Sequence, residues 1–478
     1  MHSGKVIRQW WLAVLLLAPV ALVPSCAKEG SGNGSIQHVI LISLDTTRAD
    51  HLGFLGNPTV RTPHLDALAE KSVVFTDHMT VVPTTLASHA SLFTGKYPHN
   101  HGTPRNGFTV NDGNMTLAEM LNDAGFHTAG FIGSFALDSR FGISQGFDHY
   151  DESFSILVGD GGVDQNQRSA AEVTDAVITY LDGVDPAERL FLFAHYFDPH
   201  RPYAPPPPYN TMYDPKGSDA LPSIDDILGD QKMPVDDKRK LLRRHEFAYA
   251  GEISYMDHHI GRLLDYLENK GILENSLVVV TSDHGENFTA HPMFFNHGFS
   301  VFQTTMRAAF VLYTPQWSAG FEHDDLTASI DILPTLLDLL ELPLPTGVDG
   351  QTIEMDKPAT TNPPVPRVRF GQATKPIRAE TDPRWANILK ARFIRAGRYK
   401  LIEVPYSRGQ ALFDLTADPG ETRNLLEDPS PQVARLAQQL RDRLRSWAVD
   451  VEPLESTFDD TQREETLERL KSLGYIND

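Results

Sequence analysis

Side chains that can hold a divalent cation follow strongly apolar segments at two places in the sequence. The apolar run 38–44 is followed by Asp45, and the apolar run 277–282 is followed by Asp283 and His284. Carboxylate and imidazole groups together are typical ligands of Zn²⁺ and Mn²⁺. A cation held by such a set can activate a hydroxyl nucleophile and polarise an ester oxygen, which is the chemistry of metal-assisted ester cleavage.

A third apolar run, residues 190–194, is followed by His195 and shortly afterwards by His200. Continuous apolar runs of this length are typical of strands buried on both faces of a parallel sheet. In open α/β sheets, functional residues gather beyond the carboxyl ends of the strands. We therefore expect the three runs to be core strands whose ends carry the reactive groups. His195 itself is expected to be structural.

Segments with the apolar spacing of helices lie between and after these runs, and the alternation of strand and helix predicts an α/β fold. The expected helices comprise residues 116–124, 170–181, 247–270 and 330–340. Asp257, His258 and His259 fall in the third of them, where we expect a solvated helix face rather than a site. Further along, residues 393–402 have the pattern of a hairpin around Ala396-Gly397, and residues 431–447 and 461–473 again have helical spacing.

The first residues have the pattern of an export signal. Lys5 and Arg8 precede an apolar run, residues 10–23, which at about 14 residues fits a signal peptide better than a membrane-spanning helix. The run leads into Pro24-Ser25-Cys26, which resembles a bacterial lipobox with an atypical proline. We expect an exported protein of the cell envelope or periplasm, lipid-anchored through Cys26, with an ordinary cleaved signal as the alternative. Since Cys26 is the only cysteine, intrachain disulfides and cysteine-ligated metal sites are excluded.

Charge and composition limit the partners. The 63 acidic and 42 basic residues give a formal net charge of −21, which argues against electrostatic binding to nucleic acid or to an anionic membrane surface. We expect a small-molecule, glycan or lipid ester as substrate, and membrane contact only through the lipid anchor. The expected division is a signal segment at 1–26, a flexible tether at 27–36, a catalytic domain at 37–356, a Pro-rich linker at 357–385 and a C-terminal subdomain at 386–478.

The segment Pro83–Pro98 resembles the signature of the sulfatase family. In that family a Cys or Ser is followed by x-Pro-x-Arg and then by a Leu-Thr-Gly segment. Alignment on Leu92–Gly95 places Thr85 at the nucleophile position and His89 at the Arg position. Further segments that resemble sulfatase motifs are Leu44–Asp50, Asp198–His200, Ser282–Glu286, His297-Gly298 and Phe413–Glu421.

The resemblance implies the α/β sandwich of alkaline phosphatases and sulfatases, with a central, mostly parallel sheet and a smaller C-terminal α+β subdomain. It implies that His200 and His297 face the substrate, where either can protonate the leaving group. Asn106 matches a residue that binds a substrate oxygen in the nucleotide pyrophosphatase/phosphodiesterase branch, although it can instead cap a turn. The residues at metal-ligand positions are Asp45, Thr85, Asp283 and His284.

Departures from the sulfatase pattern bear on the chemistry. Thr85 lacks the primary thiol or hydroxyl that sulfatases oxidise, and His89 replaces the Arg of the recognition motif, so no formylglycine is expected. Thr is the nucleophile in similar phosphodiesterases and in phosphoethanolamine or phosphoglycerol transferases. His89 either orients Thr85 or is structural. Thr46 and His284 stand where sulfatases usually have Asp and Asn, which favours Zn²⁺ or Mn²⁺ and leaves Ca²⁺ possible. One ion is expected, because Ala204 occupies the position of a second-site His.

The expected function is metal-dependent hydrolysis of a sulfuric or phosphoric ester with Thr85 as nucleophile. A phosphate diester or monoester is favoured, because a sulfated threonine has no elimination route for release. Two alternatives remain open at this point. One is a phosphoethanolamine- or phosphoglycerol-type transferase, and the other is an inactive sulfatase-like binding protein of the cell surface.

Overall fold

The structure is a computed structural model. It describes residues 36–154, 166–291, 295–317, 320–355, 367–381, 385–427, 429–449, 454–456, 463–473 and 475. The expected signal segment, Cys26 and the expected tether up to residue 35 lie outside the described residues. Within the described residues, no helix combines the length and the apolar character needed to cross a membrane.

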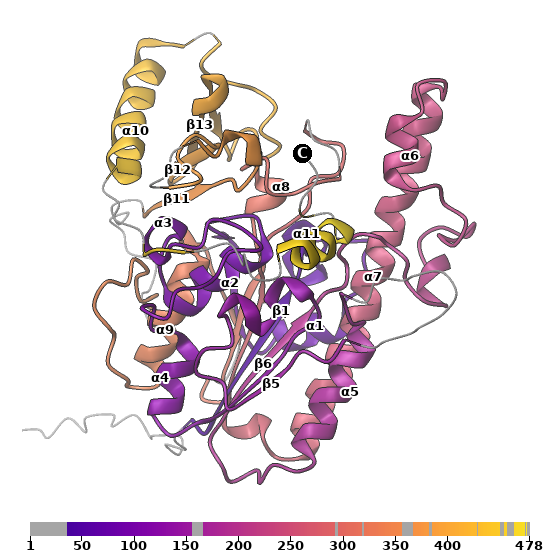
Figure 1. Ribbon diagram of the computed structural model, residues 1–478, viewed down its shortest axis with the longest axis vertical. Helices are drawn as coiled ribbons and strands as arrows, with labels where there is room; N and C mark the ends of the chain where they lie inside the picture. The colour runs from indigo at the N-terminus through magenta and orange to yellow at the C-terminus, as the bar shows by residue number, and fades with distance from the viewer. Residues whose placement is uncertain are drawn as a thin grey trace, which may run out of the picture. The chain divides into compact units, whose positions relative to one another are not determined.

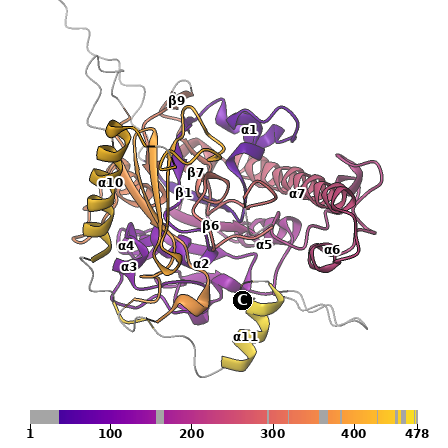
Figure 2. The same cartoon turned by 90° about the horizontal axis from the view of Figure 1, so that it is seen from above.

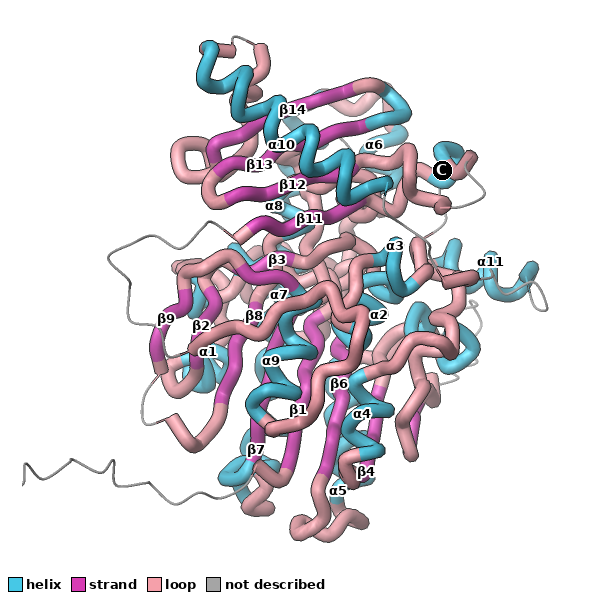
Figure 3. The backbone as a smooth tube through the Cα atoms, turned by 90° about the vertical axis from the view of Figure 1, so that its left-hand side faces the viewer, coloured by secondary structure: helices cyan, strands magenta, loops and turns pink. Residues whose placement is uncertain are grey.

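The main sheet has eight strands in the order β5-β4-β6-β1-β7-β8-β2-β9 (Figure 3). All neighbouring strands are parallel except that β8 runs antiparallel to β7 and β2. Their bounds are β1 His38–Leu44, β2 Val73–Phe75, β4 His127–Phe131, β5 His149–Asp151, β6 Leu190–Tyr196, β7 Ser276–Ser282, β8 Phe310–Tyr313 and β9 Phe321–His323. The two short strands β3 (His78–Met79) and β10 (Thr327–Ala328) form a separate pair.

The three predicted core strands are confirmed as β1, β6 and β7, the middle of the sheet. Every residue of each is buried, which explains why their sequences are continuously apolar rather than alternating. Leu44 of β1 pairs with Tyr196 of β6 and with Ser282 of β7. The residues that follow the three strands therefore emerge at one edge of the sheet.

Helices cover both faces of the sheet, because alternate residues of the central strands point to opposite sides. Ile40 and Ile42 pack into one apolar core with α1, α5 and α7, whereas Val39 and Leu41 pack into a second core with α2, α4 and α9. Figure 2 shows α1 and α7 on one side of the central strands and α2 and α4 on the other. The bounds are α1 Pro63–Ala69, α2 Thr85–Thr94, α3 Pro98–His101, α4 Leu117–Asp123, α5 Ala170–Leu181, α6 Ile224–Gly229, α7 Val235–Asn269, α8 Gln303–Met306 and α9 Ile332–Leu339.

The long helix α7 differs from its prediction in two respects. It begins at Val235, earlier than the expected 247. The prediction missed the first turns because they carry mostly exposed charged residues with little apolar periodicity. Its Asp257 lies on a face that the sequence pattern suggested to be solvated, yet it is 1% exposed. The Asp257 carboxylate accepts a hydrogen bond of 2.8 Å from the backbone N–H of Leu65. It thus satisfies a free N–H at the start of α1.

A second, antiparallel sheet lies C-terminally and consists of β11 Val368–Gln372, β12 Arg392–Ala396, β13 Tyr399–Val404 and β14 Gly409–Asp414. The predicted hairpin at 393–402 is confirmed as β12 and β13. Helix α10 (Pro431–Val449) packs on this sheet, whereas α11 (Arg463–Ser472) contributes to the core of the main sheet instead (Figure 1). Strand β11 falls inside segment 357–385, which the sequence suggested to be linker. The strand has only five residues and directly follows the Pro-rich run, so it gives a weak signal in the sequence.

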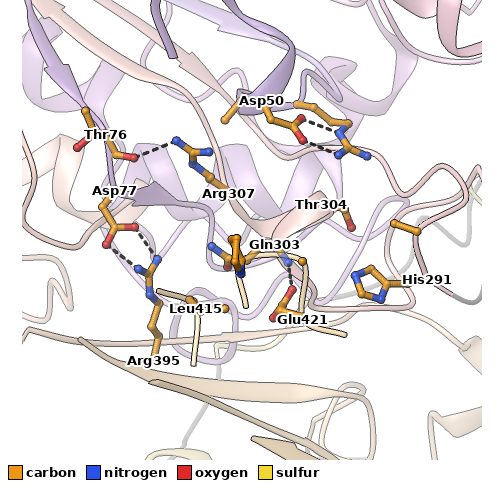
Figure 4. A pocket seen from close by; sticks show the side chains of 15 residues that line it. Asp50, Thr76, Asp77, His291, Gln303, Thr304, Arg307, Arg395, Leu415 and Glu421 are labelled. Atoms are coloured by element: carbon orange, nitrogen blue, oxygen red, sulfur yellow. Dashed lines mark hydrogen bonds and ion pairs between the residues drawn. The ribbon is translucent and has the colours of Figure 1, made fainter. Parts of the chain in front are cut away.

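A cavity of about 540 Å³ lies where the C-terminal sheet meets the loops around β2 and α8, and charged side chains line it (Figure 4). Arg395 of β12 binds Asp77 through two hydrogen bonds of 2.6 Å. Glu421 accepts a hydrogen bond from the backbone N–H of Gln303 and forms an ion pair of 2.8 Å with Lys400, both side chains being fully buried. The Arg395–Asp77 pair and the hydrogen bond between Gln303 and Glu421 attach the C-terminal sheet to the rest of the protein, whereas the Lys400–Glu421 pair lies within the C-terminal part.

Replacing Glu421 with glutamine is expected to destabilise the protein by about 3–5 kcal/mol. The substitution leaves the Lys400 ammonium buried beside a neutral group, which costs more than a broken surface pair. Chemical denaturation of Glu421→Gln against wild type measures the change. Asp236→Asn removes the partner of Arg239 in a largely exposed pair and serves as the control, with no measurable change expected. Equal stability of wild type and Glu421→Gln would show that the buried Lys400–Glu421 pair does not contribute to the free energy of unfolding.

Candidate active site

Asp45, Asp283 and His284 meet at the carboxyl edge of the main sheet. One ligand atom from each of the three side chains lies within 4.8 Å of the others, and all three residues are buried. This closeness follows from the pairing of β1 with β7, since the residue after Leu44 lies beside the residue after Ser282. Within the described residues, it is the one group of three or more His, Cys, Asp or Glu residues with metal-binding spacing.

Thr46 orients both carboxylates. Its backbone N–H donates to Asp283 Oδ1 at 2.9 Å, and its hydroxyl donates to Asp45 Oδ1 in a short hydrogen bond. The backbone of Thr46 has a φ of 51°, in the left-handed region that β-branched residues rarely adopt. The strained turn lets one residue hold two acidic groups, and strain of this kind is often found at functional sites.

Thr85 is the first residue of α2 and lies beside this carboxylate pair. Its hydroxyl donates to Asp45 Oδ2 at 3.3 Å, and its side chain is fully buried. The helix start is where unpaired backbone N–H groups and the positive end of the helix dipole favour an anion. The structure therefore brings Asp45, Thr85, Asp283 and His284 together at one place.

The donor atoms of this group suit a divalent cation. The Nδ1–H of His284 donates to the carbonyl of Gly285 at 2.9 Å, which leaves the Nε2 lone pair free for a ligand. Within the described residues, His284 Nε2 and Asp283 Oδ2 are buried without any hydrogen-bond partner. Buried polar atoms without partners are costly unless something else satisfies them. A bound metal ion would satisfy these atoms, and two carboxylates, an imidazole and a hydroxyl are suitable ligands for it.

The electrostatics of the group support the same conclusion. Burial, followed by the charge of Asp45, raises the pKa of Asp283 well above its usual value. Burial also opposes ionisation of Asp45, but the hydrogen bond and charge of His195 outweigh it, so the pKa of Asp45 is lowered. Burial lowers the pKa of His284 to about 4, which keeps the imidazole neutral. A bound cation would offset the electrostatic repulsion between the carboxylates of Asp45 and Asp283.

His195, the sixth residue of β6, contacts this group although the sequence favoured a structural role for it. Its Nε2 lies 3.1 Å from Asp45 Oδ2, and its Nδ1 accepts a hydrogen bond of 3.2 Å from the Gly133 backbone N–H. The ring therefore donates from Nε2 and orients the carboxylate, as partners of metal ligands commonly do. The signal in the sequence was its position at the end of an apolar run. The structure adds the register, in which His195 pairs with Ser43 of β1.

His200 and His297 lie side by side, with ring centroids 5.3 Å apart. The Nδ1–H of His200 donates to the Arg201 carbonyl at 2.8 Å, and Nδ1 of His297 lies 3.4 Å from Glu286 Oε2. Within the described residues, the Nε2 atoms of both rings are buried without a partner. Burial lowers the pKa of His200 and, together with His200, that of His297. The His297 ring is also 4.6 Å from the His284 ring, which places the pair beside the acidic group.

Asn106 and His89 support the start of α2. The Asn106 side-chain oxygen accepts a hydrogen bond of 2.8 Å from the Leu86 N–H, and within the described residues its buried Nδ2 has no partner. His89 Nδ1–H donates to the Thr85 carbonyl at 2.7 Å, while its Nε2 is 2.8 Å from Ser43 Oγ. His89 thus contacts the backbone of Thr85 rather than its hydroxyl, so it positions the helix turn.

Tyr475 is the residue of the site that the sequence did not indicate at all. Its hydroxyl lies 3.2 Å from Thr85 Oγ1, although 390 positions separate the two residues in the chain. No local pattern in the segment after residue 473 signals a functional residue, because the contact depends on where α11 docks.

Acidic groups and a histidine at the carboxyl edge of a mostly parallel sheet, with a hydroxyl at a helix start beside them, form an arrangement that can bind a divalent cation and support ester cleavage. The chain belongs to the sulfatase family, because the family's sequence profile, described as Sulfatase, matches residues 37–342. The sheet topology and the likeness to solved structures confirm the expected fold, and the protein is a hydrolase acting on ester bonds.

Three relatives illustrate the similarity. An arylsulfatase of Clostridium perfringens is 28% identical over 380 residues, covering 66% of this chain and 77% of the relative. An N-acetylglucosamine-6-O-sulfatase of Bacteroides thetaiotaomicron is 25% identical over 495 residues, covering 86% of each chain. The crystal structure of a phosphonate monoester hydrolase of Agrobacterium radiobacter superposes with a TM-score of 0.70 at 23% identity, covering 86% of this chain and 96% of the other.

Proposed function

We propose that this protein cleaves a sulfuric or phosphoric ester by direct attack of the Thr85 hydroxyl, at a site that binds one divalent cation. The supporting observation is the position of Thr85 Oγ1, 3.3 Å from Asp45 Oδ2, because the Asp45 carboxylate belongs to the group of potential metal ligands with Asp283 and His284. When bound, the cation supplies Lewis acidity that lowers the pKa of the hydroxyl and withdraws charge from an ester oxygen. The mixed donor set favours Zn²⁺ or Mn²⁺ over Ca²⁺.

The two histidines beside the site serve the leaving group. The Nε2 atoms of His200 and His297 are free to take up a proton, since the Nδ1 atom of each ring faces an oxygen acceptor. Entry of an anionic ester raises the pKa of a nearby imidazole. Each ring can then hold the proton that the departing alkoxide takes from Nε2. The Asn106 amide, whose Oδ1 is engaged by Leu86, has its Nδ2 available to donate to a substrate oxygen.

Thr85 favours a phosphate ester over a sulfate ester. A sulfated formylglycine releases its sulfate by elimination, but an ester on the threonine oxygen has no such route. Water or an alcohol must instead attack the sulfur or phosphorus atom. Similar proteins include both sulfatases and a phosphonate ester hydrolase, so the fold accommodates esters with sulfur and with phosphorus at the reacting centre.

A substrate series tests the proposal. The purified protein is supplied with Zn²⁺, Mn²⁺ or Ca²⁺ and tested on p-nitrophenyl sulfate, p-nitrophenyl phosphate, bis-p-nitrophenyl phosphate and p-nitrophenyl phenylphosphonate. We expect release of p-nitrophenol from a phosphate ester, loss of activity with a chelator, and recovery with Zn²⁺ or Mn²⁺. Peptide mass spectrometry at Thr85 checks that the residue is unmodified.

The other outcomes separate the rival functions. Turnover of the sulfate alone, with Thr85 unmodified, would refute the phosphate preference. Little release to water but rapid transfer to an added alcohol would indicate a transferase. No turnover and no bound metal would indicate a binding protein of the sulfatase type.

We also propose that the protein is exported and lipid-anchored through Cys26, on the pattern of residues 10–26. Cys26→Ser is expected to move the protein from the membrane fraction to the soluble periplasmic fraction, because a lipid chain supplies the membrane affinity. Fractionation and immunoblotting measure the distribution. A wild-type protein found wholly in the soluble fraction would contradict the anchor and favour an ordinary cleaved signal.

A further inference from the structure

We propose that Tyr475 is a substrate-contacting residue of this site, whose hydroxyl donates a hydrogen bond to an oxygen of the sulfuryl or phosphoryl group. This proposal rests on the proposed function, because it assumes that a tetrahedral ester approaches Thr85. It adds a donor supplied by the segment after α11, far from the sulfatase motifs in the chain.

The docking of α11 places Tyr475. Leu470 is fully buried and Leu473 is 7% exposed, and both belong to the apolar core that contains α2 and α4. The guanidinium of Arg469 lies 3.5 Å from the centroid of the Phe135 ring, in the loop that follows β4. These contacts hold the end of the helix against the carboxyl edge of the main sheet.

The phenol itself lies among the groups assigned to the reaction. Its oxygen is 3.2 Å from Thr85 Oγ1, and its ring centroid is 5.2 Å from that of His200 and 6.1 Å from that of His297. Tyr475 is 4% exposed. An atom about 3–3.5 Å from a nucleophile occupies the distance at which a reacting group is held before attack. A bound ester therefore replaces the contact between Tyr475 and Thr85 and meets the phenol directly.

The hydroxyl of Tyr475 can donate a hydrogen bond to the substrate without carrying a charge. Each transferred group is an anion that enters beside two carboxylates, so it needs donors. The neutral ring of His200 carries its proton on Nδ1, toward the Arg201 carbonyl, and its Nε2 can donate only after the ring is protonated. The phenol of Tyr475 and the amide of Asn106 donate while uncharged. The ordinary pKa of a phenol, about 10, keeps the proton on Tyr475 at neutral pH.

Tyr475→Phe tests the proposal, because it removes the hydroxyl and keeps the ring that fills the core. We expect kcat on the best ester to fall by about 10²-fold, the cost of losing one donor to a developing oxyanion. The metal content and the thermal midpoint should stay unchanged. Tyr406→Phe, at a residue that is 46% exposed, is the matched control and should behave as wild type.

Two kinetic results would overturn the proposal. An unchanged kcat would mean that the phenol only packs against the histidines. A raised kcat would mean that the segment obstructs the nucleophile.

A binding measurement separates this proposal from the proposed function. Calorimetric titration with tungstate, a tetrahedral oxyanion, is performed on the Zn²⁺-supplied wild type and on Tyr475→Phe. We expect the variant to bind tungstate at least about 10-fold more weakly, the cost of one hydrogen bond to a charged group. This result would support the contact even if no ester in the series were cleaved. Equal affinities, or no binding to either protein, would overturn it.

Discussion

Thr85→Ala is expected to reduce ester turnover by about 10⁴-fold or more, which is the scale of loss when a covalent nucleophile is removed. The physical reason is that the reaction then lacks the hydroxyl that the start of α2 places against Asp45 Oδ2. The side chain is small and fully buried, so its loss removes little apolar contact. Steady-state kinetics with the best ester from the substrate series measures the effect.

Thr85→Ser is the matched control. It keeps the hydroxyl at the start of α2 and removes one methyl group, so we expect activity within about 10-fold of wild type, the loss coming from a less restricted side-chain rotamer. Thr85→Ala with wild-type activity would show that water or another group attacks the ester. In that case the metal site would remain, but the proposed covalent step would be wrong.

Asp283→Asn is expected to have opposite effects on the protein with and without metal. With a cation present at about 100 times its dissociation constant, wild type should gain roughly 2.7 kcal/mol of stability that the variant lacks. Without metal, the variant should be the more stable protein. The asparagine keeps the oxygen that accepts from Thr46 N–H and His284 N–H, and it removes a charge that burial and Asp45 both disfavour.

The sign of the pH dependence follows from the raised pKa of Asp283. A carboxyl group whose pKa is higher in the folded than in the unfolded protein binds more protons when folded, so metal-free stability falls as pH rises through that interval. We expect this decline in wild type and a smaller one in Asp283→Asn. Thermal denaturation from acidic to neutral pH, with and without Zn²⁺, measures both effects, and elemental analysis measures bound metal.

Asp148→Asn is the control for the metal-binding measurement, because Asp148 lies in the loop between β4 and β5 with its side chain 42% exposed. It should bind metal as wild type does. Undiminished Zn²⁺ binding and stabilisation in Asp283→Asn would show that the cation binds elsewhere. That result would remove the basis for assigning Asp283 as a ligand.

Much of this site could be predicted because its signals are local. A strand buried on both faces must be continuously apolar, so β1 and β7 were visible in the sequence together with the polar residues that follow them. The alternation of such strands with helices indicated the fold class. Asp45, Asp283 and His284 could be named because parallel strands bring their carboxyl ends to one edge.

Other parts of the site carried no local signal. His195 is one of several histidines near apolar runs, and only the register of β6 against β1 places it against Asp45. Asp257 follows the helical pattern of α7, and its burial depends on the packing of α1 across that face. Hydrogen-bond partners of this kind are chosen by tertiary packing, which the periodicity of a single segment does not encode.

The amino-acid sequence by itself determined the three central strands, the family and the polar residues at the ends of those strands, because these depend on local apolar patterns and on short motifs. The tertiary structure alone decided that His195 orients Asp45, that His89 supports the backbone of Thr85, and that α11 brings Tyr475 to within 3.2 Å of the Thr85 hydroxyl. The physical reason is that each of these contacts joins residues distant in the chain, whose approach is set by how complete helices and strands pack together.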